Sequence, residues 1–341
     1  MYREPIAEIA ALFDVYQQGL AFHAICAMTR LEVPDRLADG PRDVPGVAAE
    51  LGLDADAFRR LLRLLECHEI VGYDPGADEA WLTDRGELLC RDHPMSLRAT
   101  FATLGVSDVA HRLVDTLRTG GPAAPAALGE GFWEYLAARP DRQAVFSEAM
   151  AEQARLLSLP CVPLLDWPAG GTVADVGGGS GVLLTAVLEA APGVRGLLLD
   201  QPQVLPRARE RLARHGLADR CDVLPHDLFD RAPAAEVYLL SRVLHDWDDA
   251  SVARILSRLA EAAAPGARLR LFEDLLPEKG PLAPTQAWSD VVMMVLYDGA
   301  RERTLGQYRA LLEQAGWVLD GTVAGPPGMH VIEARRGGRP A

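Results

Sequence analysis

Lysine is almost absent from this sequence of 341 residues, in which Lys279 stands alone beside 33 arginines. Acidic residues outnumber basic ones by 48 to 34, which gives a net charge of −14. Proteins that hold nucleic acid phosphates are usually basic, so this balance argues against that class. We interpret the arginine excess, which accompanies many alanines, as the codon bias of a GC-rich genome and not as a phosphate-binding feature.

Cysteine is scarce as well, and long apolar runs are missing. The five cysteines are scattered and form no CxxC pair: Cys26, Cys67, Cys90, Cys161 and Cys221. Zinc sites and disulfide frameworks need clustered or paired thiols, so we expect reduced, buried residues. No run approaches the roughly 18 apolar residues that span a membrane, and the N-terminus lacks a secretory pattern. We expect a cytoplasmic globular protein without a membrane partner.

The N-terminal region predicts a small helical domain. Residues 5–31 carry apolar side chains at helical spacing, which predicts one or two amphipathic helices. Residues 45–89 predict a winged helix: a helix through Leu51, a second helix capped by Asp54 or Asp56, and two short strands. Residues 1–105 hold 10 arginines and 18 acidic residues, a net charge of −8. Because modules that read DNA are usually basic, we expect packing or dimerisation here and no nucleic acid partner.

A segment rich in proline and glycine, residues 159–171, predicts the main domain boundary. Before it, residues 100–158 predict further helices, interrupted by a loop at 120–131. Beyond it, short apolar strands at 172–177, 196–200, 221–227, 236–242 and 267–276 alternate with helices at 181–191, 206–216 and 251–266. This alternation is typical of an α/β protein with a doubly wound, mostly parallel sheet that binds its ligand at the carboxyl ends of the strands.

The first of these strands ends in a glycine-rich turn, VADVGGGSG at 173–181. Gly177, Gly179 and Gly181 allow a tight turn and a close approach to a ligand. The spacing is GxGxG and not the GxGxxG of dinucleotide-binding proteins, and no GxxxxGK[ST] loop for a nucleoside triphosphate is present.

Acidic residues follow the next two strands. Asp200 ends the second strand, where a carboxylate can accept both hydroxyls of a ribose. Asp227 follows the third strand and can reach an adenine amino group, while Leu228 can cover the ring. With the glycines, these residues predict an adenosine site. The GxGxG spacing fits S-adenosylmethionine (SAM), whose amino-acid part needs close backbone approach but which has no pyrophosphate.

A candidate base, His245, follows the fourth strand in SRVLHDWDD. Glu273 ends the fifth strand and would face the same cleft, and Glu302 follows an apolar helix. An imidazole flanked by carboxylates is held in one orientation and favours proton uptake, as a general base for a phenol must. A surface helix cap is the alternative interpretation of Glu302.

The chain resembles the plant caffeic-acid-type O-methyltransferases and their bacterial relatives in antibiotic biosynthesis. The motifs that carry the resemblance are VADVGGGSG, LLLDQP, HDLF, LSRVLHDWDD, LFEDLLP and RERT, which follow the family's order along nearly the whole chain. The resemblance implies an α/β fold: a Rossmann-like, doubly wound class I SAM-dependent methyltransferase with an N-terminal all-helical winged-helix domain. It assigns homodimerisation to residues 1–105, a helical connector that contributes to the substrate pocket to 106–160, and SAM binding to 161–341.

The resemblance also implies roles for single residues. His245 is the base, supported by Glu273 and Glu302. The implied cofactor-binding positions are Asp175, Gly177, Gly179, Asp200, Gln201, Asp227, Leu228, Phe229 and Ser241. The implied acceptor-binding positions are Phe146, Met150, Gln153, Asp246, Trp247, Met293 and Tyr297, with plain core packing as the alternative for each aromatic residue and methionine. Plant members carry a lysine at Ser241, and some carry a histidine near Leu296, so contacts at these two places differ.

We therefore expect a metal-independent, SAM-dependent O-methyltransferase that acts on a small aromatic hydroxyl compound of bacterial secondary metabolism and releases S-adenosylhomocysteine. One alternative is a C-methyltransferase for an α-keto acid or an activated ring. A second is a family member that catalyses a non-methylating step, against which His245, Glu273 and Glu302 argue. A third is a SAM-sensing regulator that binds DNA, against which the charge of residues 1–105 argues.

Overall fold

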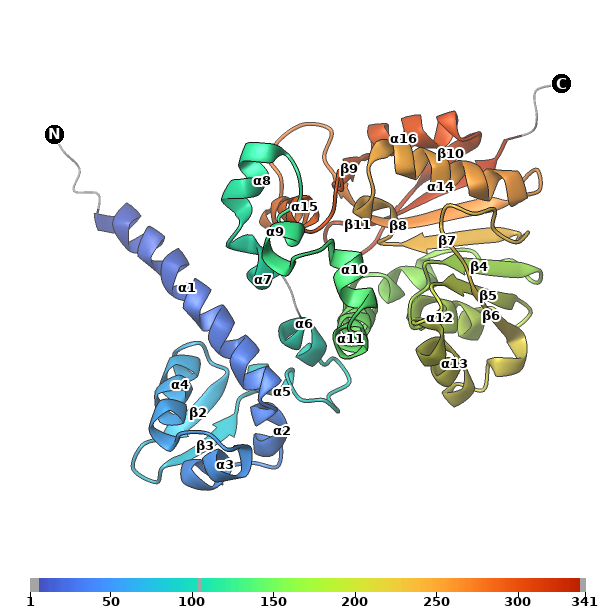
Figure 1. The fold of residues 1–341 in the computed structure, drawn as a ribbon. Helices are drawn as coiled ribbons and strands as arrows, with labels where there is room; N and C mark the ends of the chain where they lie inside the picture. The colour runs from blue at the N-terminus through green and yellow to red at the C-terminus, as the bar shows by residue number, and fades with distance from the viewer. Residues whose placement is uncertain (1–5, 104–105, 338–341) are drawn as a thin grey trace. The chain divides into compact units, whose positions relative to one another are not determined.

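The computed structural model describes residues 6–103 and 106–337. The chain divides into two compact units, Met1–Thr103 and Leu104–Ala341 (Figure 1). The proline- and glycine-rich segment 159–171 lies inside the second unit, where its first residues form a 3₁₀ helix, η1 (Leu159–Leu164). The three-part division of the chain, with a separate connector at 106–160, stays a prediction.

The first unit combines helices with a small sheet. The two predicted strands are confirmed as the antiparallel hairpin β2–β3. The description of this unit as all-helical is wrong, because a short extended segment, β1, pairs with β3 and completes the three-stranded order β1-β3-β2. The elements are α1 (Ile6–Arg30), α2 (Val33–Leu37), β1 (Arg42–Asp43), α3 (Val44–Leu51), α4 (Ala55–Cys67), β2 (Val71–Asp74), β3 (Glu79–Leu82), α5 (Asp84–Glu87) and α6 (Arg98–Ala102).

The second helix of the predicted pair, α4, begins where the sequence indicates. Of the two candidate caps, Asp54 is the one used: its carboxylate accepts a hydrogen bond of 2.8 Å from the backbone N–H of Ala57. Such a cap satisfies a donor that the first turn leaves free and stabilises the helix by about 1 kcal/mol. The side chains of Phe58, Leu62 and Leu65 are buried in the core of this unit.

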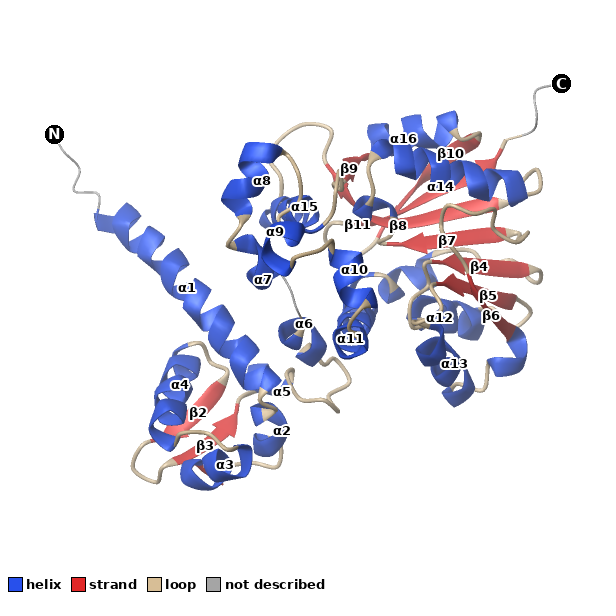
Figure 2. Cartoon of the chain, in the orientation of Figure 1, coloured by secondary structure: helices blue, strands red, loops and turns tan. Residues whose placement is uncertain are grey.

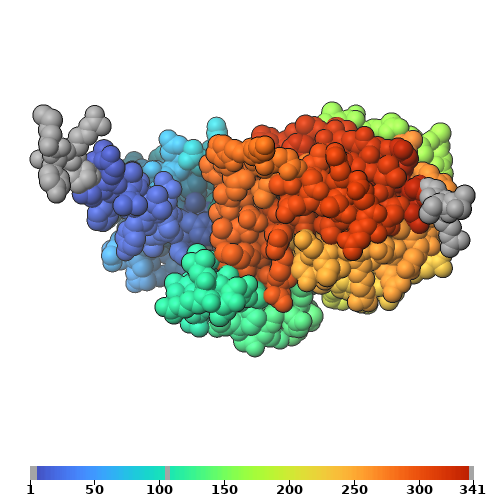
Figure 3. Space-filling model, turned by 90° about the horizontal axis from the view of Figure 1, so that it is seen from above, coloured from blue at the N-terminus to red at the C-terminus, as the bar shows by residue number. Residues whose placement is uncertain are grey.

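The long helix α1 is one continuous element, and its two halves differ in burial. All residues from 6 to 20 are exposed, and among them Leu12 is 73% and Tyr16 is 79% exposed. The C-terminal half is anchored by buried residues such as Ala24 and Met28. In the space-filling view, α1 in blue lies at the surface (Figure 3).

Helices before the sheet open the second unit. The loop predicted at 120–131 is wrong in its centre, where α9 forms; Pro125 at the start and the following alanines favour a short helix there. These helices are α7 (Val106–Ala110), α8 (Leu113–Thr119), α9 (Ala124–Leu128), α10 (Phe132–Ala137) and α11 (Pro140–Leu157), and α15 (Pro284–Leu296) packs with α7 and α8 later in the chain.

The predicted mostly parallel sheet is confirmed, in the order β10-β11-β8-β7-β4-β5-β6 with β9 paired to β8. The strand order reverses at β4, so the glycine-rich turn lies at the switch point where such sheets bind ligands. The strands are β4 (Thr172–Val176), β5 (Arg195–Asp200), β6 (Cys221–Pro225), β7 (Val237–Ser241), β8 (Arg268–Leu276), β9 (Arg303–Thr304), β10 (Trp317–Ala324) and β11 (Met329–Arg336).

Helices cover both faces of this sheet (Figure 2). Successive residues of a strand point to opposite faces, so Val173 packs in the core with α12 and α13 while Ala174 packs in the core with α14 and α16. The covering elements are α12 (Val182–Ala190), α13 (Leu205–Arg214), α14 (Asp249–Ala262) and α16 (Leu305–Gln314), with the short 3₁₀ turns η2 (Ala218–Arg220) and η3 (Leu244–Asp246).

Three features complete the description. The antiparallel hairpin β10–β11, which pairs with β8 through β11, lies beyond the last strand predicted from the sequence. All five cysteines are free thiols; four are buried, but the expectation of burial is wrong for Cys67, which is exposed. Among the described residues, no helix has both the length and the apolar character to cross a membrane.

Candidate active site

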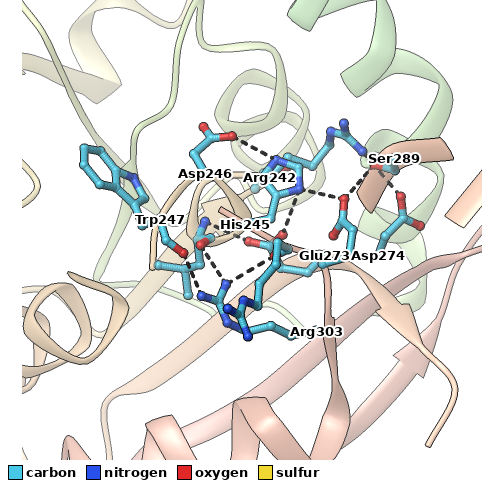
Figure 4. Close-up of polar contacts among 12 residues, drawn as sticks. Arg242, His245, Asp246, Trp247, Glu273, Asp274, Ser289 and Arg303 are labelled. Atoms are coloured by element: carbon cyan, nitrogen blue, oxygen red, sulfur yellow. Dashed lines mark hydrogen bonds and ion pairs between the residues drawn. The ribbon is translucent and has the colours of Figure 1, made fainter. Parts of the chain in front are cut away.

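The candidate base lies at the carboxyl end of β7, in the short turn η3. His245 is buried there, with 3% of its surface exposed. Its Nδ1 lies 3.1 Å from Oε1 of Glu302 and 3.8 Å from Oε2 of Glu273 (Figure 4). Its Nε2 lies 3.5 Å from Oδ1 of Asp246. The structure therefore brings together the three residues that the sequence singled out for proton transfer.

The two supporting carboxylates come from different parts of the sheet, and each is held by further bonds. Glu273 lies in β8, and its Oε1 accepts a hydrogen bond of 3.0 Å from the backbone N–H of Leu244. Glu302 lies just before β9, and its Oε1 also accepts a bond of 2.6 Å from the hydroxyl of Ser289 on α15. Glu302 is 2% exposed, so the interpretation as a surface helix cap is wrong.

The electrostatics of this cluster favour a proton on the imidazole. Burial alone would lower the pKa of His245, but the carboxylates of Glu302, Glu273 and Asp246 outweigh it and raise this pKa to about 9. Burial raises the pKa of Glu273 to about 7 and that of Asp246 to about 6. Burial acts in the same direction on Glu302, but its contact with His245 dominates and holds this pKa below the ordinary value. The site is thus built to accept a proton at His245.

The glycine-rich turn after β4 has the backbone that its sequence requires. Gly177 and Gly179 have φ angles of 73° and 57°, which side chains disfavour. A Cβ at Gly177 would meet Cγ2 of Val243 at 2.8 Å, whereas nothing lies within 4 Å of a Cβ at Gly179. The turn therefore leaves open space above Gly179, where a ligand can approach the backbone.

Asp200 closes this turn from the end of β5. Its Oδ2 accepts a hydrogen bond of 2.7 Å from the N–H of Gly179, and its Oδ1 accepts one of 2.6 Å from the N–H of Gln201. Each carboxylate oxygen keeps a further lone pair for a ligand hydroxyl. Asp175, inside β4, is 1% exposed, and burial and the charge of Asp200 raise its pKa to about 7.

The remaining cofactor candidates follow β6 and β7. Asp227 is exposed, and its Oδ1 accepts a hydrogen bond of 2.8 Å from the N–H of Phe229. Leu228 and Phe229 are half-buried in the same loop. Ser241 ends β7, where its hydroxyl lies 2.9 Å from that of Ser158 at the end of α11. Because β6 and β7 belong to the parallel part of one sheet, residues that follow their carboxyl ends lie at the same edge of the sheet as His245.

An aromatic cluster contains three of the predicted acceptor residues. Met293 on α15, Tyr297 directly after α15 and the half-buried Phe146 on α11 share one apolar cluster. Sequence reasoning missed two members on α10: Trp133, stacked on Tyr297 with ring centroids 5.1 Å apart, and Phe132, which meets Phe146 edge-on at 5.5 Å. The motif GFWEYL carries these rings but no pattern that distinguishes them from ordinary core residues.

Other residues that were predicted to bind the acceptor lie outside this aromatic cluster. Met150 and Gln153 are half-buried on α11, at the spacing that places them on one face with Phe146. Trp247 does not join the aromatic cluster. Its ring packs edge-on against Phe229, at a centroid distance of 4.9 Å, so it lies with a residue predicted to surround the adenine.

Two arginines near His245 were also missed. Arg242 has a left-handed backbone, with φ of 55°, and its guanidinium lies 3.6 Å from the carboxylate of Asp274. Arg303 is fully buried and donates hydrogen bonds to backbone oxygens on both sides of His245. A signal for Arg303 existed, because it belongs to the motif RERT that also contains Glu302.

Among the described residues, one group has the donor set and spacing of a metal site. His245, Glu273 and Glu302 each offer an atom, and these atoms lie within 4.8 Å of one another. The same closeness is explained by a hydrogen bond from the imidazole to Glu302. A metal-independent site remains the prediction, and chelation tests it.

Comparison with known proteins gives one family. The family described as O-methyltransferase domain matches residues 111–318. The mitomycin biosynthesis 6-O-methyltransferase of Streptomyces lavendulae is 36% identical over 331 residues, which cover 95% of this chain and 93% of that protein. The 8-amino-8-demethylriboflavin N,N-dimethyltransferase of Streptomyces davaonensis is 35% identical over 318 residues, which cover 91% of this chain and 90% of that protein.

This chain is also similar to a solved O-methyltransferase structure. The O-methyltransferase NcsB1 from neocarzinostatin biosynthesis, in complex with SAM and 2-hydroxy-5-methyl naphthoic acid, aligns with a TM-score of 0.80. It is 33% identical, and the alignment covers 92% of this chain and 95% of that one. Both units of this chain thus have counterparts in proteins of similar length.

Proposed function

Because the chain belongs to the O-methyltransferase domain family, the caffeic-acid-type enzymes that the sequence resembles, we propose that it transfers a methyl group from SAM to a hydroxyl of a small aromatic compound, with His245 as the general base. The observation that carries this proposal is the 3.1 Å contact between Nδ1 of His245 and Glu302 in a buried site. The aromatic acceptor is supported by relatives such as NcsB1, whose structure contains a hydroxynaphthoic acid.

The edge of the sheet fits SAM. The open space above Gly179 would take the methionine part, and the two oxygens of Asp200 would accept the ribose hydroxyls. Asp227 would accept from the adenine amino group, beside the side chains of Leu228 and Phe229. When bound, SAM supplies a methyl group already activated by the positive charge on its sulfur.

The chain itself contributes orientation and proton removal. The N–H at Nδ1 of His245 donates a hydrogen bond to Glu302, which leaves the lone pair of Nε2 free to accept a proton from the acceptor hydroxyl. Glu302 and Glu273 then stabilise the imidazolium that forms. A general base of this kind typically contributes about 10²–10⁴-fold in rate. Orientation of the acceptor, by the rings of Phe146, Trp133 and Tyr297, contributes up to about 7–11 kcal/mol.

The test is a set of phenols incubated with the protein and SAM, with methyl gain followed by mass spectrometry. The set includes 3-amino-4-hydroxybenzoic acid and 2-hydroxy-5-methyl naphthoic acid. His245→Ala is expected to bind SAM with unchanged affinity in calorimetry and to lose turnover by at least about 10²-fold. Unchanged turnover in His245→Ala would remove the base from the proposal.

N-methylation is the second candidate, and it is favoured by the relative that dimethylates an amino-riboflavin. A neutral aromatic amine attacks through its own lone pair, so it needs no base before the methyl moves. We expect His245→Ala to retain most turnover on an amine acceptor. 3-Amino-4-hydroxybenzoic acid offers both groups, and NMR of the product locates the new methyl on oxygen, nitrogen or carbon.

We assign homodimerisation to α1. Apolar side chains in its exposed half follow a spacing of three and four residues, at Ile6, Ile9, Phe13, Tyr16 and Leu20, which we call the α1 seam. This is the spacing with which two helices pack side by side. Each residue of the seam is 48–79% exposed in the single chain, and such a contiguous apolar surface is rare on monomers. A second copy of the chain is the partner that the seam fits.

A further inference from the structure

Three consecutive residues, 301–303, form hydrogen bonds with the turn that carries His245. The backbone N–H of Arg301 donates a hydrogen bond of 3.0 Å to the carbonyl of His245. Glu302 accepts from the imidazole. Arg303 donates hydrogen bonds to the backbone on either side of the histidine (Figure 4).

The guanidinium of Arg303 uses separate nitrogens for separate parts of the turn. One terminal nitrogen donates to the carbonyl of Leu244 at 3.0 Å, and the other donates to that of Trp247 at 2.6 Å. Nε donates to the carboxylate of Asp249, in the first turn of α14, at 2.9 Å. The planar guanidinium group thus holds Leu244, Trp247 and the first turn of α14 in fixed positions around His245.

The burial of Arg303 indicates what its hydrogen bonds to η3 are for. The side chain has no exposed surface. Removing a charge from water is expensive, and a buried ion pair is weak evidence for a role in stability alone. The turn η3 is a single 3₁₀ turn, whose carbonyls lack the helical partners that a longer helix would give them. Charge-assisted bonds to these carbonyls are strong and directional, so they fix the backbone from which the imidazole projects.

We propose that Arg303 is a positioning residue for methyl transfer: it holds η3 so that the ring of His245 meets the carboxylate of Glu302. This inference rests on the proposed function of His245 as the base. Catalytic groups must be held within about 0.5 Å of their productive geometry, and hydrogen bonds from the supporting residues are what hold them there. Arg303 touches no reacting atom, and it acts through the histidine alone.

The experiment follows the imidazole of His245 by NMR in protein with isotope-labelled histidine, where His245→Gln identifies the signal among the eight histidines. In the wild type, the titration midpoint is expected near pH 9. Arg303→Gln is expected to lower it by more than about one pH unit, because the ring leaves the carboxylates that raise its pKa. Arg303→Lys is expected to shift it as well, since one ammonium cannot reach both carbonyls in the same geometry.

The matched control is Arg270, another fully buried arginine of the same unit. It binds Asp166 and Glu333, and it makes no bond to η3. Arg270→Gln is expected to lower thermal stability as Arg303→Gln does, yet to leave the His245 titration unchanged. Should both variants be too unstable to study, Asp249→Asn keeps the guanidinium, removes one of its anchors and is expected to give a smaller shift in the same direction.

An unchanged His245 titration in folded Arg303→Gln would overturn the proposal, as would an equal shift in Arg270→Gln. These results need no acceptor, so they are separate from the test of the proposed function. If His245→Ala keeps full turnover on a phenol, the base assignment fails whatever the NMR shows. If His245→Ala loses turnover while Arg303→Gln leaves the imidazole unmoved, only the positioning role fails.

Discussion

Nδ1 of His245 and Oε1 of Glu302 lie 3.1 Å apart, although the two residues are 57 positions apart in the chain. This contact sets both the orientation of the imidazole and its affinity for a proton. Glu273 approaches the same nitrogen but lies 3.8 Å away and bonds to the backbone of Leu244 instead. The two glutamates therefore support the histidine unequally.

Glu302→Gln is expected to lower turnover by about 10²-fold, because the amide holds the ring less firmly and does not stabilise the imidazolium. Glu273→Gln is expected to lower turnover less than tenfold, because its amide oxygen can still accept from Leu244. The measurement is kcat and KM for both variants with one acceptor. Equal losses would contradict the unequal support that the distances indicate.

The activity should depend on pH through His245. A general base must be unprotonated before it accepts the substrate proton, and the pKa of His245 in the free enzyme is raised to about 9. We expect kcat/KM to rise about tenfold per pH unit below this value and to level off above it. In Glu302→Gln the rising limb is expected to move to lower pH. The acceptor hydroxyl also titrates, but its limb would not move with the enzyme variant, so a fixed limb would assign it to the acceptor.

That His245 and Glu273 lie in one site was predictable from the sequence, because both belong to the carboxyl ends of strands in the same sheet. His245 follows β7 and Glu273 lies in the C-terminal half of β8, and the carboxyl ends of such adjacent parallel strands share one edge. The path of Trp247 was not predictable in the same way. Its ring direction depends on the 3₁₀ turn that precedes it, and that turn sends it to Phe229. The role of Arg303 was not predicted either. It binds backbone carbonyls, and because every residue type has one, the sequence does not mark these partners.

In the fold, too, some elements were predicted from the sequence and others were not. Alternating strands and helices from 172 to 276 are regular and were predicted, as was the mostly parallel order. The hairpin β10–β11 has alternating burial on Trp317–Ala324, but its antiparallel pairing to β8 depends on a free sheet edge that only the assembled fold presents. The short helix α9 formed where glycine and proline indicated a loop, because the alanines between them have high helix propensity.

Asp175→Asn is expected to stabilise the protein at alkaline pH. The pKa of Asp175 is raised to about 7 by burial and by Asp200, so the folded state binds this proton more tightly than the unfolded state does. The stability that this group contributes is therefore present below about pH 4 and is lost as the pH rises through 7. Between pH 5 and 8 the loss is about 3 kcal/mol in the wild type and absent in the variant.

Denaturant unfolding at pH 5 and pH 8 measures this difference. Asp222→Asn, at an exposed carboxylate on β6, removes the same charge without the burial and serves as the control. A stabilisation by Asp175→Asn of the same size at both pH values would show that Asp175 is already ionised at pH 5.

Chelation is expected to leave turnover unchanged. The imidazole bonds to Glu302 and Glu273 accepts from the backbone of Leu244, and proton removal at His245 requires no Lewis acid. Assays after dialysis against EDTA, and again after addition of Mg²⁺ or Zn²⁺, give the comparison. A loss of turnover that metal restores would make His245, Glu273 and Glu302 ligands and would remove the general base from the mechanism.

Phe13→Arg, in the α1 seam, is expected to convert a dimer into a monomer. An isolated helix gains little stability from its own hydrogen bonds, so the exposed half of α1 needs packing against a partner to remain helical. A charge in the centre of the seam must be buried without a partner if the dimer is to persist. Light scattering distinguishes the 36.8 kDa chain from its dimer. Gln18→Arg, on the opposite face of α1, adds the same charge and is expected to keep the dimer; a wild-type monomer, or equal dissociation in both variants, would contradict pairing through the seam.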